Sequence, residues 1–454
     1  MSASQKRLLA PVDAAWLSMD SPESPLVITV LMRVEGLTDE KLRGLLHSPW
    51  LRRFRLDQRP VQRAGTWWWE PVEDFSPEDH LHSAEGVLAD ESALEQAVEQ
   101  AMGRSLPDSA PLWECLYLPV ADGVHGVVFR VHHCYGDGLS LVRLFERLST
   151  SSPDQAGILP AENTSDETCE EHSAVDRAWR WAQQQFARLL SGQGIGSDPG
   201  QWLNQGVHLA REVSDFLFQP ADSASILRQP LGGEKSCVWS AGQPLFPLKA
   251  TARAAGCSLN DLVLAAVTGG LRRYLLEQAE TPETLQMHAA MPVDLRRLMS
   301  ESLRPPRDRP VNAFGTVFLP LALDAESPLE RLYRTKHETR RMKNSWQPLI
   351  AWGLLCAAGY LPWQWQEPLI RLFGQRASLV ISNVPGSPST RYLGGCPVRE
   401  QLFWVPQAGG MGLGISIMSY AGELRLGIQA DRALVANPRL LLDYCLEELS
   451  QEAL

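Results

Sequence analysis

Residues 131–148 read VHHCYGDGLSLVRLFERL, and this stretch joins a predicted strand to a predicted helix. Two adjacent histidines, His132 and His133, end an apolar run, a Gly-Asp-Gly turn follows, and apolar residues then recur at helical spacing. Successive side chains of a strand point to opposite faces, so only one of these histidines can enter a given cavity. A histidine held in one orientation is a natural general base near neutral pH. The stretch therefore predicts either an acid/base site or two structural histidines at a strand end.

A metal site is a third interpretation of the paired histidines, and the rest of the sequence argues against it. Zinc is bound by three or four convergent protein ligands. The other histidines form no ligand pattern beyond the His-x-His at 80 and 82, and the eight cysteines are scattered without a CxxC pair. Scattered cysteines are typical of reduced thiols rather than of a disulfide framework. We expect no metal ion and no redox cofactor.

The sequence before this stretch alternates between strand and helix patterns. Residues 26–36 are rich in β-branched side chains, and residues 38–46 begin with Thr and acidic residues, as helices often do. Residues 94–106 have helical spacing. Residues 113–120 and 126–133 then resemble two strands of a hairpin that leads directly to the histidines.

The sequence after this stretch divides into an acidic linker and a second mixed region. Residues 150–173 are polar and acidic and contain too few apolar side chains to form a core. Helical spacing returns at 174–190, and a Gly-rich break follows. Beyond about residue 225 we predict helices at 259–278 and 437–451, the latter capped by Asn437, and strands at 314–323, 377–384, 412–420 and 424–431. The chain is thus expected to be an α/β protein with an N-terminal part at 1–150, a linker at 151–224 and a C-terminal part at 225–454.

Composition excludes some classes of function. The 454 residues carry a formal net charge of −11, which argues against a nucleic-acid partner because binding phosphates needs a concentrated basic surface. The N-terminal 20 residues lack the unbroken apolar run of a secretory signal, so we expect a cytoplasmic protein.

The longest apolar stretch, residues 348–363, is shorter than the roughly 20 residues that a membrane-spanning helix needs. It has three interpretations: a buried core helix, a helix at a membrane interface, or the wall of a lipid-binding tunnel. Four small residues would leave room for an alkyl chain on one helix face, namely Gly353, Ala357, Ala358 and Gly359. Peripheral association with membranes or lipid inclusions follows from the second interpretation.

The pattern HHxxxDG, here His132, His133, Asp137 and Gly138, resembles the motif of chloramphenicol acetyltransferase and of peptide-synthetase condensation domains. Further blocks, in order along nearly the whole chain, resemble the bacterial wax ester synthase/diacylglycerol acyltransferase family. These blocks are the N-terminal LAPVDAAWLSMDSPESPL, Pro111-Leu112-Trp113, Asn260-Asp261, MPVDLR at 291–296, Asn312 before FGTVFLPL, SNVPG at 382–386, and 419–431.

The resemblance implies two chloramphenicol acetyltransferase-like subdomains, each a mixed β-sheet with flanking helices, around a central active-site channel. His133 would be the general base that takes the proton of an acceptor hydroxyl as its oxygen attacks the thioester of acyl-CoA. Asp137 would pair with an arginine of the other half, for which Arg296 in MPVDLR is the candidate. Acyl-CoA and a long-chain alcohol or diacylglycerol would be substrates, with no bound cofactor.

The supporting residues have narrower expected roles. Asn260 would hold a neighbouring loop or donate to the developing oxyanion, although an Asn-Asp pair that opens an apolar helix is equally an N-cap. Leu112 and Trp113 would pack the hairpin below the active site, and Pro111 belongs to the same supporting motif. His132 would face away from the site and support it.

The chain also departs from the family pattern. Cys134, Tyr135 and Gly136 replace small aliphatic residues, and Asp294 stands where Ser is frequent, so Tyr135 and Asp294 are candidates for altering the acceptor. Cys134 is expected to pack rather than to act as a nucleophile. Two alternatives remain open: the same fold acylating another hydroxyl or an amine, and a non-catalytic lipid-binding protein.

Overall fold

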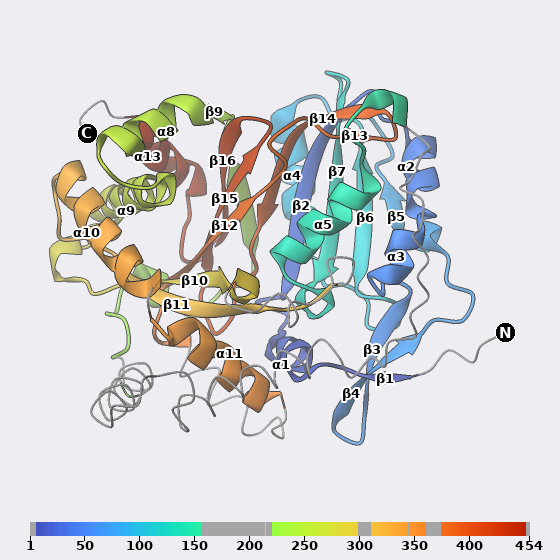
Figure 1. Ribbon diagram of the computed structural model, residues 1–454, viewed down its shortest axis with the longest axis horizontal. Helices are drawn as coiled ribbons and strands as arrows, with labels where there is room; N and C mark the ends of the chain where they lie inside the picture. The colour runs from blue at the N-terminus through green and yellow to red at the C-terminus, as the bar shows by residue number, and fades with distance from the viewer. Residues whose placement is uncertain are drawn as a thin grey trace, which may run out of the picture.

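The computed structural model describes residues 6–155, 214, 220–297, 310–343, 345–359 and 374–450. The predicted helix at 174–190, most of the predicted linker and residues 360–363 lie outside these ranges. Two α/β halves lie side by side (Figure 1), one built mainly from the N-terminal part of the sequence and one from the C-terminal part.

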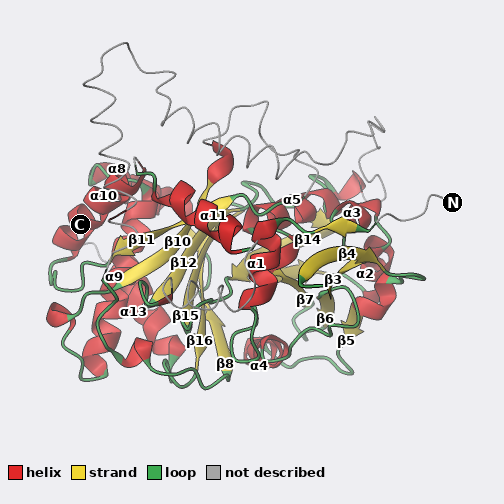
Figure 2. Ribbon diagram, turned by 90° about the horizontal axis from the view of Figure 1, so that it is seen from below, coloured by secondary structure: helices red, strands yellow, loops and turns green. Residues whose placement is uncertain are grey.

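The N-terminal half is a six-stranded sheet with helices on both faces (Figure 2). Its central strand β2 is apolar along nearly its whole length because both of its faces are covered. Helix α5 packs one face through Leu141, Leu144, Phe145 and Leu148, and α4 packs the other. The sheet order is β13 (Tyr392–Leu393), β14 (Cys396–Trp404), β2 (Val27–Glu35), β7 (Val124–His132), β6 (Trp113–Leu118) and β5 (Leu81–Ser83), and the helices are α2 (Asp39–Leu46), α3 (Pro49–Arg53), α4 (Glu91–Met102) and α5 (Gly138–Leu148).

The C-terminal half is a mixed seven-stranded sheet. Its order is β11 (Phe314–Pro320), β10 (His288–Asp294), β12 (Leu379–Pro385), β15 (Leu413–Tyr420), β16 (Glu423–Asp431) and β8 (Lys235–Trp239), with β9 (Gln243–Pro244) beside β16. Val317 and Leu319 of β11 point into a core with α9, whereas Phe318 between them packs on α11. The helices are α8 (Leu245–Ala254), α9 (Leu259–Glu277), α10 (Pro328–Lys343), α11 (Gln347–Ala358) and α13 (Pro438–Ser450).

A small third sheet and short helices complete the described fold. Strands β1 (Arg7–Leu8), β4 (Thr66–Pro71) and β3 (Gln58–Arg63) form an antiparallel sheet beside helix α1 (Pro11–Met19). The 3-10 turns are η1 (Pro77–His80), η2 (His133–Tyr135), η3 (Pro153–Gln155), η4 (Ile226–Arg228), η5 (Pro282–Thr284) and η6 (Leu295–Arg297).

The segment after β12 crosses from one half to the other. The Gly386 N–H donates to the Ser419 carbonyl at 2.8 Å, and a Cβ at Gly386 would lie 2.8 Å from that oxygen, so only glycine fits where the chain leaves the sheet. Strand β14 then pairs antiparallel with β2, from Val398 opposite Val34 to Trp404 opposite Thr29. The sheet of the N-terminal half is therefore completed by residues from the C-terminal part of the sequence.

The predicted α/β class with two mixed sheets is confirmed, and the predicted hairpin is β6 with β7. Strands β8, β10 and β14 were not predicted. Pro292 interrupts the strand pattern of β10, and β14 begins Cys-Pro and carries charged residues, so neither has the uniform β-branched composition of β2. Within the described ranges, no helix by itself has both the length and the apolar character to cross a membrane; α8 and α9, which meet at 94°, reach them only together.

Candidate active site

The two histidines separate where β7 ends. His132 is the last residue of the strand and is buried, and its Nδ1 accepts the Cys134 backbone N–H at 3.1 Å, which closes turn η2. Its Nε2 lies 3.7 Å from Oδ1 of Asp20. His133 instead lines a cavity between the two halves, and His132 does not. The prediction that only one histidine enters a cavity is thus confirmed.

Asp137 begins helix α5 and joins the two halves. Its carboxylate accepts the backbone N–H and the hydroxyl of Ser140, both at 2.9 Å, as an N-cap does. Nη2 of Arg296 donates to both carboxylate oxygens at 3.0 and 2.8 Å, and the Ala313 N–H adds a third donor at 3.1 Å. Burial opposes ionisation, but the guanidinium and the N–H donors outweigh it and lower the pKa of Asp137. The expected ion pair with Arg296 is confirmed.

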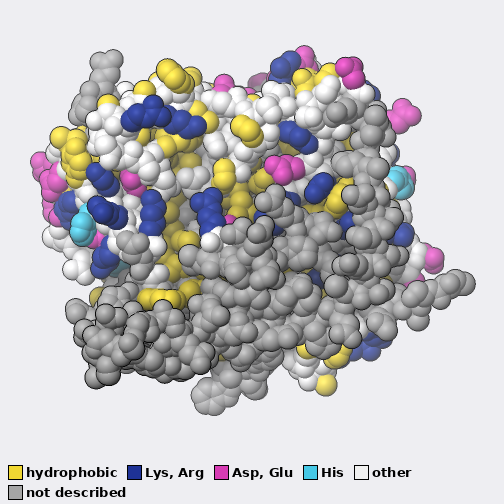
Figure 3. Space-filling model, viewed as in Figure 1, with side chains coloured by type: hydrophobic (Ala, Val, Ile, Leu, Met, Phe, Trp, Pro, Cys, Tyr) yellow, Lys and Arg dark blue, Asp and Glu magenta, His cyan; other side chains and the backbone are white. Residues whose placement is uncertain are grey.

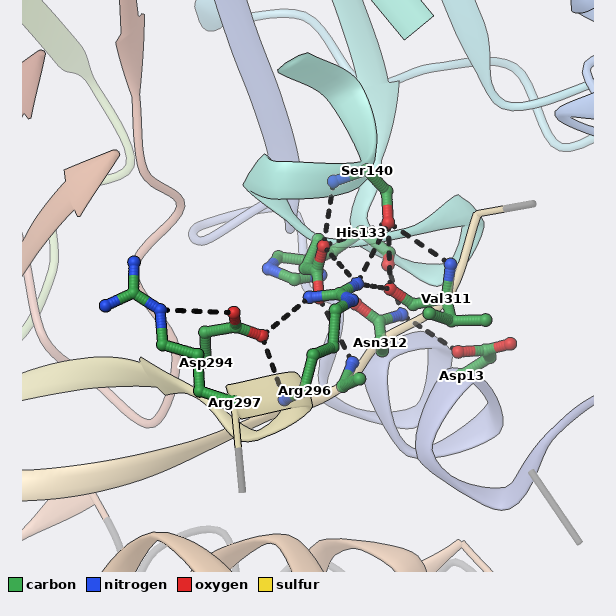
Figure 4. Close-up of polar contacts among 10 residues, drawn as sticks. Asp13, His133, Ser140, Asp294, Arg296, Arg297, Val311 and Asn312 are labelled. Atoms are coloured by element: carbon green, nitrogen blue, oxygen red, sulfur yellow. Dashed lines mark hydrogen bonds and ion pairs between the residues drawn. The ribbon is translucent and has the colours of Figure 1, made fainter. Parts of the chain in front are cut away.

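Arg296 is itself held in place from the C-terminal half (Figure 4). Its Nη1 donates to Asp294 at 3.1 Å, and its Nη2 also donates to the Val311 carbonyl at 3.0 Å. The Val311 N–H in turn donates to the hydroxyl oxygen of Ser140 at 3.2 Å. The contact between the halves is thus a connected polar network in which the charged groups have several partners.

The His133 ring is packed between aromatic side chains. It stacks on Trp16 of α1 with 4.2 Å between ring centroids and 15° between planes, and Phe314 of β11 lies 5.5 Å away. Burial lowers the pKa of His133 to about 4, against smaller opposing effects of its own carbonyl and Asp137. The ring is therefore neutral at physiological pH. Nδ1 is buried without a hydrogen-bond partner, so Nε2 is the nitrogen available to the cavity.

The cavity beside His133 has a volume of about 400 Å³ and is largely apolar. Strand β12 contributes Ser382 and Asn383 to its polar lining, which also includes Asp137, Asp294, Arg296, Arg297 and Thr316. Gly138, the first residue of α5, borders it, and a Cβ there would lie 3.3 Å from Val384. The apolar wall includes Ile28, Leu139, Phe314, Phe318, Val380, Phe403, Val405 and Met411.

Helix α11 forms one wall of this cavity, but of the four small residues predicted to make room for an alkyl chain only Ala358 lines it. Ala351 and Ala358 are buried and line the cavity, together with Leu354. Ala357 is exposed and lies outside the lining, and so does Gly353. The helix is apolar all round, so periodicity could not show which face turns inward.

The Cys-Tyr-Gly segment after His133 turns away from the cavity. Cys134 is buried in the N-terminal core, and burial raises the pKa of its thiol, in agreement with a packing role. The Tyr135 hydroxyl donates to the Gln58 carbonyl at 2.5 Å and accepts the Leu112 N–H at 3.1 Å. Tyr135 does not line the cavity, so any effect of this residue on the acceptor would be indirect. Asp294 does line the cavity.

The supporting motifs pack around the site rather than in it. Pro111 and Leu112 are buried, and Trp113 stacks on His80 at 4.4 Å with its indole N–H donating to the Leu56 carbonyl. None of the three lines the cavity, so the expected packing role is confirmed.

The Asn-Asp pair lies at the start of α9, but neither residue is the N-cap. Ser258 is the N-cap, and Asp261 completes a capping box with it while also accepting the Thr339 hydroxyl at 2.6 Å. Asn260 accepts from Nδ2 of Asn383 at 2.9 Å and does not line the cavity itself. Asn260 therefore reaches the site only through strand β12.

Sequence reasoning assigned no role to Trp16, Asp13 or Asn312, which all surround His133. The N-terminal block and Asn312 were noted only as matches to the family. Asn312 and Asp13 are 299 residues apart, so no local sequence pattern could show that they are in contact. Only their positions in the family pattern indicated that they belong to the site. Within the part of the chain that the structure describes, no group of three His, Cys, Asp or Glu side chains could hold a metal ion.

The fold and the position of its histidine define an acyltransferase-like class. Over 98% of each chain, the structure resembles the wax ester synthase/diacylglycerol acyltransferase from Marinobacter aquaeolei VT8, with a TM-score of 0.67 and 20% identity. It also resembles the first condensation domain of the calcium-dependent antibiotic synthetase, with a TM-score of 0.63 and 15% identity over 100% of this chain and 98% of that one. These likenesses establish the fold.

Sequence profiles identify the family. The wax ester synthase/diacylglycerol acyltransferase catalytic domain matches residues 9–263, and the WS/DGAT C-terminal domain matches residues 311–451. The "Putative diacyglycerol O-acyltransferase Mb0919" of Mycobacterium bovis is 26% identical over 97% of this chain and 90% of its own length. The chain belongs to the wax ester synthase/diacylglycerol acyltransferase family and is an acyltransferase.

Replacing Asp137 by Asn should strongly destabilise the fold. Asn keeps the N-cap, but it removes the buried one of the two carboxylates that pair with the Arg296 guanidinium, and breaking a buried ion pair costs up to about 3–5 kcal/mol. Chemical denaturation would measure the loss of unfolding free energy. Asp324→Asn is the matched control, because the Asp324–Arg334 pair at 2.8 Å is solvent-exposed and is worth less than about 1 kcal/mol. Equal losses in the two variants would contradict the structural role of Asp137.

Proposed function

We propose that this protein transfers a fatty acyl group from acyl-CoA to a long-chain alcohol or diacylglycerol, with His133 as general base. The observation that carries the proposal is the buried His133 imidazole, which lines a largely apolar cavity of about 400 Å³ and has Nδ1 turned into the protein. We infer that Nε2 faces the cavity and that burial keeps the ring neutral. An apolar cavity suits alkyl chains, and a neutral imidazole can accept a proton.

In the proposed reaction, the acceptor hydroxyl gives its proton to Nε2 of His133 as its oxygen bonds to the thioester carbonyl carbon. The carbon–sulfur bond then breaks, and the imidazolium returns the proton to the departing thiolate, which leaves as free CoA. No acyl-enzyme forms. Placing both substrates in one cavity makes their encounter effectively unimolecular.

The distribution of side chains on one face of the molecule supports acyl-CoA as the donor. On the face seen in Figure 3, a band of exposed hydrophobic side chains lies between the halves, and Lys and Arg side chains stand on both sides of it. Acyl-CoA joins an apolar chain to anionic phosphates, so such a face favours its approach. The expected association with membranes or lipid inclusions stays a prediction.

Replacing His133 by Asn should abolish turnover without unfolding the protein. With palmitoyl-CoA and hexadecanol, CoA release should fall by at least about 100-fold, the usual contribution of a general base. Cys134→Ala is the control, because its thiol lies outside the cavity and the mechanism does not use it. Undiminished turnover in His133→Asn would contradict the mechanism. A panel of alcohols, diacylglycerols and amines would identify the acceptor, and saturable acyl-CoA binding with no turnover would favour a binding protein.

The pH profile tests the protonation state of His133. Because its pKa is lowered to about 4, kcat/KM should stay constant from pH 7.5 to 5.5 and decline only in more acidic buffer. The unfolded chain binds this proton near pH 6.5 and the folded chain near pH 4, so folding stability declines as the pH falls through that window. Initial rates should therefore be measured immediately after dilution from a neutral stock, before acid unfolding occurs. The rates then report protonation of His133 rather than loss of the fold. A decline centred at pH 6.5 would contradict the buried, neutral base.

Chain-length preference tests whether helix α11 forms the wall of the substrate cavity. Ala358→Phe fills part of the cavity, so the ratio of kcat/KM for long over short chains should fall by about tenfold or more. Ala357→Phe is the matched control one residue away, since Ala357 is exposed and outside the lining. An unchanged preference in Ala358→Phe, or equal shifts in both variants, would exclude this wall from substrate binding.

A further inference from the structure

Asn312 links helix α1 to the backbone of His133 (Figure 4). Its Nδ2 donates to Oδ1 of Asp13 at 2.8 Å and to the His133 carbonyl oxygen at 2.8 Å. All three residues are buried, with 5–6% of their surface exposed. One amide group thus connects a carboxyl group of α1 with the carbonyl of the proposed base.

The Asp13 carboxyl group fixes which way the Asn312 amide points. Reversing the amide would turn its oxygen toward two other oxygen atoms, and both hydrogen bonds would be lost. Oδ1 of Asn312 is buried and has no hydrogen-bond partner, so its acceptor end adds nothing to this choice. The orientation of the amide therefore depends on Asp13 and the His133 carbonyl.

Helix α1 also contacts the ring of His133. Trp16 follows Asp13 by three residues, so the two side chains lie on the same side of the helix. Trp16 stacks on the imidazole with 4.2 Å between centroids, while Asp13 reaches the carbonyl of the same residue through Asn312. The helix thus contacts both the side chain and the backbone of His133.

Asp13 occupies a position that is unfavourable for a carboxylate. Burial raises its pKa to about 7, and Asp137 adds to this, while Asn312 and Arg55 oppose it. The negative charge of Asp13 also raises the pKa of the neighbouring Cys134 and Cys356 thiols. An apolar residue would avoid this desolvation, so the carboxyl group is explained better by its hydrogen bond than by packing.

We propose that Asp13 is a positioning residue for the acyl transfer: through Asn312 it fixes the carbonyl and, with Trp16, the ring of His133, so that Nε2 faces the substrate. This inference rests on the proposed function. Nδ1 is the ring nitrogen turned into the protein and has no hydrogen-bond partner, so the partial negative charge of the His133 carbonyl is what favours a proton on the ring. Holding that carbonyl in place therefore favours the tautomer with hydrogen on Nδ1 and a free lone pair on Nε2.

Two substitutions of Asp13 test whether its side chain acts as a hydrogen-bond acceptor or only fills space. Asp13→Asn keeps an oxygen that accepts from Asn312, whereas Asp13→Leu has a similar size and no acceptor. We expect kcat of Asp13→Leu to fall by about tenfold to a hundredfold, as for small misplacements of a catalytic group, with KM for acyl-CoA unchanged. Asp13→Asn should restore most of the wild-type kcat. Asp13→Asn should keep the wild-type melting temperature at pH 8, whereas Asp13→Leu should lower it by a few degrees because a buried Asn312 N–H loses its acceptor. Rates are therefore compared well below both melting temperatures.

A double substitution tests whether both residues act through one contact. If Asp13 acts through Asn312, Asp13→Leu combined with Asn312→Leu should be no slower than Asn312→Leu alone. Independent losses that multiply would overturn the proposal. Wild-type kcat in Asp13→Leu, or equal losses in the Leu and Asn variants, would overturn it as well.

A readout without substrate keeps this proposal separate from the proposed function. Nitrogen-15 NMR of labelled histidine rings reports the tautomer of His133, whose signals are assigned by their loss in His133→Asn. The wild-type and Asp13→Asn proteins should show hydrogen on Nδ1, and Asp13→Leu should show a mixture. An identical tautomer in all three would overturn the positioning role. A wild-type chain that never releases CoA would instead overturn the proposed function, while the tautomer still tests Asp13.

Discussion

The buried ion pair between Asp137 and Arg296 determines how the two halves of this protein meet. Arg296 bonds both oxygens of the carboxylate, and Asp294, Val311 and Ser140 satisfy the surrounding donors and acceptors. Such a pair is favourable only when its groups are fully hydrogen-bonded, which restricts the halves to one relative position. The cavity beside His133 exists because of that position, since strands and helices of both halves line it.

Local sequence signals accounted for the elements nearest the motif. A β-branched run, a Gly-Asp-Gly turn and helical spacing predicted β7, the turn and α5, and the family pattern pointed to Arg296. The strand that completes the N-terminal sheet was missed, because β14 carries a proline and charged residues in place of a strand pattern. A strand of this kind is recognisable only by its partner, β2, which lies more than 360 residues earlier.

The surroundings of His133 were harder to predict for two physical reasons. Helix α11 is apolar on all sides, so its sequence could not tell Ala358, which faces the cavity, from Ala357, which faces solvent. Tyr135 is only two residues from His133 in sequence, yet the turn at the strand end directs its hydroxyl to the Gln58 carbonyl and away from the cavity. Closeness in sequence therefore did not show which side chains line the cavity.

The pairing of β14 with β2 also bears on the order in which the molecule forms. Until residue 404 has been synthesised, β2 has a free edge, and an open edge can pair with another chain. Domains commonly fold from the N-terminus during synthesis. Here the N-terminal sheet can be completed only after almost nine-tenths of the polypeptide has been synthesised. The N-terminal half therefore cannot reach its final six-stranded form before most of the C-terminal part of the sequence is present.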